Sequence, residues 1–202
     1  MRTIERQIYR YNELSEQAQK VAIESMKDEI SNARINSDSA EYLNTLDKIQ
    51  QIFEVNIYDW RVNEYNLYFR FNFTNIDEET ENEPRLLLRY LNNNVLPCID
   101  NRKRYYTRGY KASRKSKIIF ENKYDYCITG TWTDHAIDDA LNNIKQSLKK
   151  HLNAREFVHD MIAAFFRYWQ QDCEYFCSDE YIEEEILSNE YEFLVNGKPY
   201  MN

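Results

Sequence analysis

Three groups of side chains in this sequence have types and spacings that could support chemistry. The first is a run of cations and tyrosines at 102–117 that contains no Asp or Glu. Cations neutralise phosphates and aromatic rings stack on bases, so this run predicts contact with nucleic acid. An acidic protein partner and a solvated loop are the alternatives. Its members are Arg102, Lys103, Arg104, Tyr105, Tyr106, Arg108, Tyr110, Lys111, Arg114, Lys115 and Lys117.

The second group is acidic and lies toward the C-terminus, where no Lys or Arg occurs between Trp169 and Gly197. Such a surface could mimic phosphates and occupy a basic channel of a nucleic-acid-binding partner. Helix capping and plain solvation are the alternatives, because acids in a first helical turn complement its dipole. Interspersed aromatics favour an interface. The predicted acidic face comprises Glu174, Asp179, Glu180, Glu183, Glu184 and Glu185.

The third group consists of metal-ligand types at helical spacing. Asp134 with Asp138, and His135 with Asp139, are each four residues apart, which places each pair on one helix face and is compatible with a divalent metal. Two such pairs leave a site incomplete, and Asp at a helix start is favourable without any metal. These residues are therefore weak metal candidates, and a metal-dependent nuclease centred on them is a further alternative function.

Two shorter motifs have better explanations in packing than in ligation. Glu156-x-x-His159 is half of a di-iron motif, but the chain has no second Glu-x-x-His. Cys173-x-x-x-Cys177 lacks two further ligands at zinc spacing. No nucleophile elbow, phosphate loop or dinucleotide motif is present. We predict no catalytic residue, no cofactor and a function that is not enzymatic.

The bulk composition predicts what must position these groups. With 202 residues and 43% hydrophobic content, the chain suits one globular domain. No apolar run is long enough for a membrane helix, and the first residues lack the apolar region of a signal peptide. We therefore expect a cytoplasmic protein without a membrane partner. Its four cysteines are expected to be free thiols, mostly buried.

Hydrophobic periodicity predicts helices at both ends of the chain and strands between them. Apolar spacings of three and four indicate helices over about 16–34, 39–53, 133–149 and 153–176, and Ser178 is predicted to cap an acidic helix to about 188. A short helix is expected after Pro84. Alternation over 55–61 and 65–74 predicts a hairpin that turns near Asn63, and 117–131 is typical of one or two strands.

The regions between these elements complete the predicted domain. We expect an acidic loop at 77–83, a basic loop at 100–117 and a terminal hairpin at 190–201 with its tight turn at Asn196–Gly197. The fold class is α+β, a single domain 1–202 with a helical part at 12–54, a central antiparallel sheet within 55–131 and a helical part at 133–189. The helices from both ends should pack against that sheet.

Three segments resemble small accessory proteins of phages and integrated elements of low-GC bacteria. They are Asn12–Ile23, Cys127–Thr131 and the stretch from Ser178 through Lys198. Some proteins of this group resemble type II anti-CRISPR proteins, which inhibit Cas9. The resemblance implies a non-enzymatic inhibitor and transfers no functional residue.

These observations give a first functional hypothesis and its alternative. The hypothesis is a phage or mobile-element protein that inhibits a host nucleic-acid-targeting defence enzyme, plausibly Cas9 with its guide RNA, by stoichiometric binding. The alternative is a DNA- or RNA-binding module that uses 102–117. A homodimer is compatible with exposed aromatics among the charges.

Overall fold

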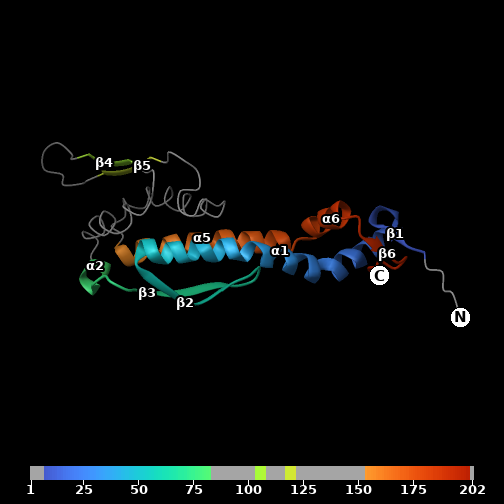
Figure 1. Cartoon of the computed structure of the whole chain (residues 1–202), viewed down its shortest axis with the longest axis horizontal. Helices are drawn as coiled ribbons and strands as arrows, with labels where there is room; N and C mark the ends of the chain where they lie inside the picture. The colour runs from blue at the N-terminus through green and yellow to red at the C-terminus, as the bar shows by residue number, and fades with distance from the viewer. Residues whose placement is uncertain (1–6, 83–102, 108–116, 122–152, 201–202) are drawn as a thin grey trace. The chain divides into compact units, whose positions relative to one another are not determined.

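The computed structural model describes residues 7–82, 103–107, 117–121 and 153–200. In chain order its elements are β1 (Tyr9–Arg10), a 3-10 turn (Tyr11–Glu13), α1 (Glu16–Phe53), β2 (Val55–Val62), β3 (Leu67–Phe73), α2 (Glu78–Asn82), β4 (Lys103–Thr107), β5 (Lys117–Glu121), α5 (Ala154–Phe176), α6 (Asp179–Ser188) and β6 (Glu192–Phe193) (Figure 1). The α+β class is confirmed. The described strands form three separate two-stranded antiparallel sheets, β1–β6, β2–β3 and β4–β5, rather than one central sheet.

Several predicted elements are confirmed. Ser15 caps α1, since the Ala18 N–H donates to Ser15 Oγ at 3.3 Å. Asn153 Oδ1 accepts from the Glu156 N–H at 2.8 Å where α5 begins, and Ser178 Oγ accepts from the Tyr181 N–H where α6 begins. The terminal turn is also present, because the Gly197 N–H donates to Leu194 O at 2.9 Å.

The predicted break between two N-terminal helices is wrong, because α1 runs without interruption from Glu16 to Phe53. Several residues near position 37 are polar types that often cap helices. Their side chains instead bond within the helix. Arg34 pairs with Asp38 at 3.2 Å, one turn apart, and Ser39 Oγ donates to Asn36 O at 2.8 Å.

Two predicted loops contain regular structure. The acidic loop at 77–83 holds α2, whose first turn is rich in acids that complement the helix dipole. The basic loop at 100–117 begins with β4, where Tyr105 pairs with Ile119 of β5. Aromatic and β-branched residues favour strands, so β4 follows from residue types already present. Residues 108–116 lie outside the described residues, as do the helices predicted after Pro84 and at 133–149.

The chain divides into two compact units. Unit 1 comprises Met1–Ser39, Asn63–Tyr65 and Gln170–Asn202, and unit 2 comprises Ala40–Val62 and Asn66–Trp169. Each contains part of α1 and part of α5. The prediction that the whole chain is one domain stays a prediction. None of the described helices has the length and apolar character that a bilayer crossing requires.

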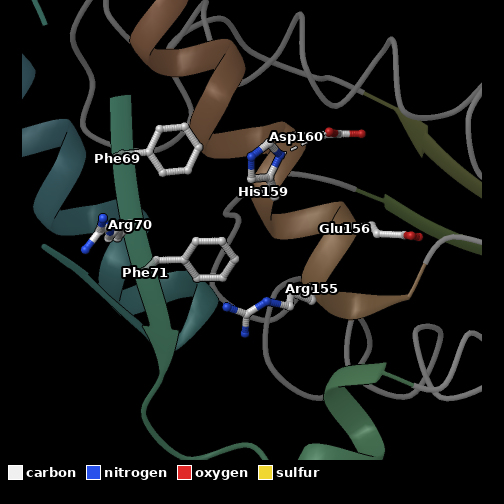
Figure 2. A pocket seen from close by; sticks show the side chains of 7 residues that line it. All are labelled: Phe69, Arg70, Phe71, Arg155, Glu156, His159 and Asp160. Atoms are coloured by element: carbon white, nitrogen blue, oxygen red, sulfur yellow. Dashed lines mark hydrogen bonds and ion pairs between the residues drawn. The ribbon is translucent and has the colours of Figure 1, made fainter. Parts of the chain in front are cut away.

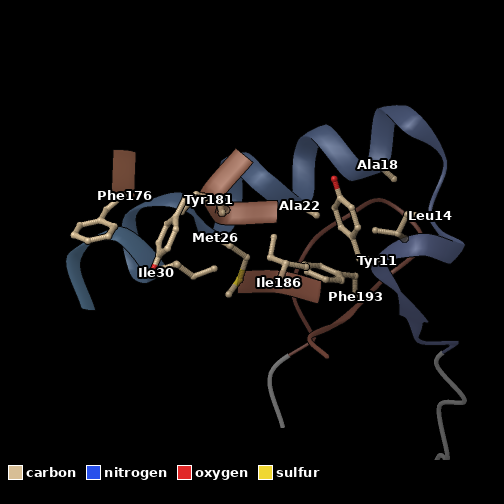
Figure 3. Close-up of a cluster of buried hydrophobic side chains, with 11 residues drawn as sticks. Tyr11, Leu14, Ala18, Ala22, Met26, Ile30, Phe176, Tyr181, Ile186 and Phe193 are labelled. Atoms are coloured by element: carbon tan, nitrogen blue, oxygen red, sulfur yellow. The ribbon is translucent and has the colours of Figure 1, made fainter. Parts of the chain in front are cut away.

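The core of unit 1 joins the N-terminal half of α1 to α6 and β6. Its buried side chains include Ala22, Met26, Ile186 and Phe193 (Figure 3). Gly197 lies directly against α1. A Cβ at this position would lie 2.0 Å from Ala18 O, and the φ of +81° is one that favours glycine. The C-terminal turn can therefore close on α1 only with glycine at position 197.

The core of unit 2 is aromatic. Tyr42 of α1 stacks on Trp169 of α5 with ring centroids 4.6 Å apart, and Trp60 of β2 lies 5.6 Å from Phe166. Phe69 of β3 stacks on the same Phe166 at 5.4 Å. The β2–β3 hairpin thus lies along α5 (Figure 1). Aromatic rings on one face of the hairpin contact this helix.

The hydrogen-bonding pattern of the hairpin follows from a contact at its open end. The Thr74 N–H donates to Glu54 O at 2.9 Å, so alternate pairs from there, including Asn56–Asn72, are the hydrogen-bonded ones. Ile57 belongs to the other set, and its N–H points away from β3. It donates to Gln50 Oε1 of α1 at 2.8 Å. The Gln50 side chain therefore accepts the hydrogen bond of a backbone N–H that does not point toward β3.

Candidate interaction surfaces

The acidic face is built by α6 and the last turns of α5. Tyr181, Ile182 and Ile186 point into the core of unit 1, which leaves the intervening acids outside. Glu174, Asp179, Glu180, Glu183 and Glu184 are exposed, and Glu185 is half-buried. Five of the six acids of the predicted face are therefore on the surface, and their role in binding stays a prediction.

Two ion pairs are formed by acids at or near the ends of α6. Lys27 of α1 donates to Asp179 at 2.9 Å, which raises the pKa of Lys27, and Arg10 pairs with Glu190 at 3.3 Å. In the parts of the chain that the structure describes, no Lys or Arg forms an ion pair with Glu180, Glu183 or Glu184. Among the described residues, therefore, no ion pair neutralises the carboxylates in the middle of α6.

Tyr175 accompanies these carboxylates on the surface. It is 47% exposed, and its hydroxyl donates to Glu184 Oε2 at 3.5 Å. Partial burial and the nearby charges of Glu184 and Glu180 raise the pKa of the Tyr175 hydroxyl. The face therefore combines negative charge with an aromatic ring, a combination suited to contact with a basic protein surface.

The sites predicted from ligand types divide between the described and undescribed parts of the chain. Asp134, His135, Asp138 and Asp139 lie outside the described residues, and the weak metal prediction there stays untested. So do most members of the basic segment. Within the described ranges, no three His, Cys, Asp or Glu residues are arranged to hold a metal ion.

Cys173 of α5 and Cys177, which follows the end of this helix, are free, as expected. Cys173 is buried and Cys177 half-buried. Burial raises the pKa of the Cys173 thiol to about 11, with the neighbouring Cys177 adding to the shift. A thiol that stays protonated at neutral pH is a poor nucleophile and a poor metal ligand, so Cys173 acts in packing.

Glu156 and His159 line an open groove of about 580 Å³ between β3 and α5 (Figure 2). Both have structural partners. Glu156 Oε2 accepts from the Asn153 N–H at 3.2 Å and so completes the cap of α5, and the His159 ring lies 5.2 Å from Phe69. His159 Nδ1 is 3.5 Å from Asp160 Oδ1. The Glu-x-x-His spacing thus reflects a helix start and a ring contact.

Arg155 of α5 also lines this groove. Its guanidinium lies 5.1 Å from the Phe71 ring centroid and pairs with Glu81 of α2. Arg155 is therefore already engaged by a carboxylate of α2 and by an aromatic ring of β3. That arrangement stabilises the packing of β3 on α5.

Sequence reasoning missed the outer face of the β2–β3 hairpin, the side opposite α5. Figure 2 shows Phe69 and Phe71 pointing toward α5 while Arg70, between them, points the other way. The alternation from Leu67 to Phe73 contained this signal, because every second residue of a strand lies on the same face. The outer face consists of Asn56, Tyr58, Arg61, Tyr68, Arg70 and Asn72.

Comparisons with protein-family models, with curated proteins and with solved structures find no match to this chain.

Proposed function

We propose that this protein is a non-enzymatic inhibitor from a phage or mobile element, which binds a nucleic-acid-targeting defence enzyme in the cytoplasm of a bacterial host. The observation that carries the proposal is the acidic face of α6, with Glu180, Glu183 and Glu184 exposed and Tyr175 beside them. Enzymes that hold nucleic acid do so through Lys and Arg. Carboxylates on a rigid helix can compete for such a surface.

Electrostatics supports binding to protein through α6. The chain has a formal net charge of −8, so its field repels a phosphate backbone and attracts a basic channel. Complementary charge raises the association rate and selects the partner. We expect stoichiometric, salt-sensitive binding that occludes the nucleic-acid site of the enzyme.

A cleavage assay tests the proposal, with Cas9 and its guide RNA as the first enzyme. Purified protein should reduce DNA cleavage when present in stoichiometric amounts. The variant Glu180→Gln/Glu183→Gln/Glu184→Gln should inhibit at least about tenfold less well, the loss expected for roughly 1.4 kcal/mol of interface energy. The variant Glu16→Gln/Glu24→Gln/Glu29→Gln removes the same charge from exposed positions of α1 and should inhibit normally.

Two results would count against the proposal in different ways. Undiminished cleavage at large molar excess would eliminate Cas9, and a pull-down from host lysate, with and without nuclease treatment, would then test for another defence enzyme. Equal inhibition by both triple variants would show that α6 is not the binding face.

A further inference from the structure

The outer face of the β2–β3 hairpin has an ordered arrangement of side chains. Directly opposed residues are Asn56 with Asn72, Tyr58 with Arg70, and Arg61 with Tyr68. Successive pairs on one face of a sheet are about 7 Å apart, twice the rise per residue. The hairpin therefore presents a pair of amides followed by two pairs that each combine a tyrosine with an arginine.

These side chains are accessible. Tyr58 is 39% exposed, Tyr68 is 47% exposed and the Arg70 side chain is 70% exposed. The opposite face supplies the packing, with Ile57 and Phe71 buried. The inner face therefore holds the hairpin in place, and the outer side chains are available to a ligand.

An acid of β2, Asp59, pairs with this face, and the backbone explains its position. The register of the two strands shifts between Tyr58 and Arg61, and Asp59 within this bulge has a φ of 47°. Its carboxylate lies 3.3 Å from the Arg70 guanidinium, with both side chains well exposed. An exposed pair of this kind is weak, so an anionic ligand can compete with Asp59 for Arg70.

We propose that this outer face binds single-stranded nucleic acid. Arg61 and Arg70 supply positive charge for phosphates, and the rings of Tyr58 and Tyr68 supply stacking platforms for unpaired bases. The amides of Asn56 and Asn72 can hydrogen-bond to base edges.

Two features favour nucleic acid over a protein partner. None of the six side chains is aliphatic, whereas the centre of a protein–protein interface is enriched in apolar contacts. Unpaired bases, unlike those of a duplex, expose the ring faces on which a tyrosine stacks. The acidic remainder of the chain limits affinity, so binding is strongest at low salt.

The test uses the full chain and fluorescein-labelled oligonucleotides of mixed sequence, read by fluorescence anisotropy. Single-stranded DNA and RNA should bind, and the corresponding duplex should bind more weakly. The logarithm of affinity should fall against the logarithm of salt concentration with a slope of about −1.4, as two phosphate contacts predict. Arg61→Gln/Arg70→Gln should remove most of that slope.

Substitutions of the tyrosines test the stacking contribution. Tyr58→Ala and Tyr68→Ala should each weaken binding by about 5- to 150-fold, whereas the phenylalanine variants should retain it. Tyr175→Ala in unit 1 is the matched control, because Tyr175 is also 47% exposed. It should bind like the wild type. Asp59→Asn should strengthen binding, because it frees Arg70 and Asn tolerates the left-handed conformation.

Several results would overturn the assignment. No binding at low salt, a preference for duplex, or wild-type affinity in the tyrosine variants would each exclude the outer face as a single-strand site, provided that circular dichroism shows the variants folded. Loss of binding only when Arg102, Lys103 and Arg104 are neutralised would assign the activity to the basic segment. This inference is independent of the proposed inhibition, since the α6 variants leave the hairpin intact.

Discussion

Units 1 and 2 close their cores in different ways. In unit 1 a glycine turn approaches the backbone of α1, beside the small side chains of Ala18 and Ala22. In unit 2 large rings of α1, β2, β3 and α5 fill the interior. Their described surfaces differ too, with carboxylates on α6 and an Arg–Tyr arrangement on the hairpin. Close backbone packing at Gly197 and the volume of aromatic rings thus stabilise different parts of this chain. We therefore expect unit 1 to be most sensitive to an added methyl group and unit 2 to the loss of a ring.

The largest expected effect is the loss of a ring from unit 2. Phe166→Ala should lower the free energy of unfolding by about 3–5 kcal/mol, because Phe166 is fully buried and contacts Phe69, Trp60 and Trp169. Urea denaturation measures the total effect. Hydrogen exchange should accelerate first in peptides from unit 2. Phe166→Leu should cost less, and equal acceleration in both units would contradict the comparison.

The corresponding test in unit 1 adds a single methyl group. Gly197→Ala should destabilise the protein by on the order of 3 kcal/mol, because the new Cβ would collide with Ala18 O and the residue would be held at positive φ. Exchange should accelerate in peptides that contain β6 and the start of α1. Val195→Ala, in the same turn but 69% exposed, should have little effect and controls for the segment.

Smaller effects are expected at the helix caps, one in each unit. Ser178→Ala removes the acceptor of the Tyr181 N–H, and Asn153→Ala removes the acceptor of the Glu156 N–H. Each should cost about 1 kcal/mol in the free energy of unfolding. Ser178→Asp and Asn153→Asp should preserve stability. A loss much larger than 1 kcal/mol for either alanine variant would indicate a role for the side chain beyond capping.

The smallest expected effect is a loss of stability at alkaline pH that depends on Tyr181 of unit 1. Burial, with Glu185 nearby, raises the pKa of Tyr181 from 10.0 to about 12. The unfolded chain therefore loses this proton first, and the stability that Tyr181 contributes is complete below pH 10 and lost as the pH rises toward about 12. Denaturation midpoints of wild type and Tyr181→Phe should show wild type losing stability relative to the variant across that range. Parallel pH profiles would refute the expectation.

Local patterns predicted much of this structure. Apolar spacing and capping residues located α5 and α6, and strict alternation located the β2–β3 hairpin. They failed where a residue type permits two roles. Asp38 and Ser39 can cap a helix or bond within it, and only the surrounding packing decides between these roles.

The candidate sites were less predictable than the elements. The exposed acids of α6 followed from helical spacing. The outer face of the hairpin did not, because its residues become neighbours only through strand register. Tyr58 and Arg70, for example, are twelve positions apart in the sequence and directly opposed in the sheet. A register shift of one residue in either strand would have assembled a different surface.

The contact between Gln50 and Ile57 has a consequence for behaviour at high concentration. Exposed strand edges are templates on which other chains can add, and proteins block them in various ways. Here the amide of a helix side chain occupies a donor on the edge of β2. We expect a residue without an acceptor at position 50 to leave the Ile57 N–H without this partner, and so to make the edge of β2 more available for pairing with a second chain.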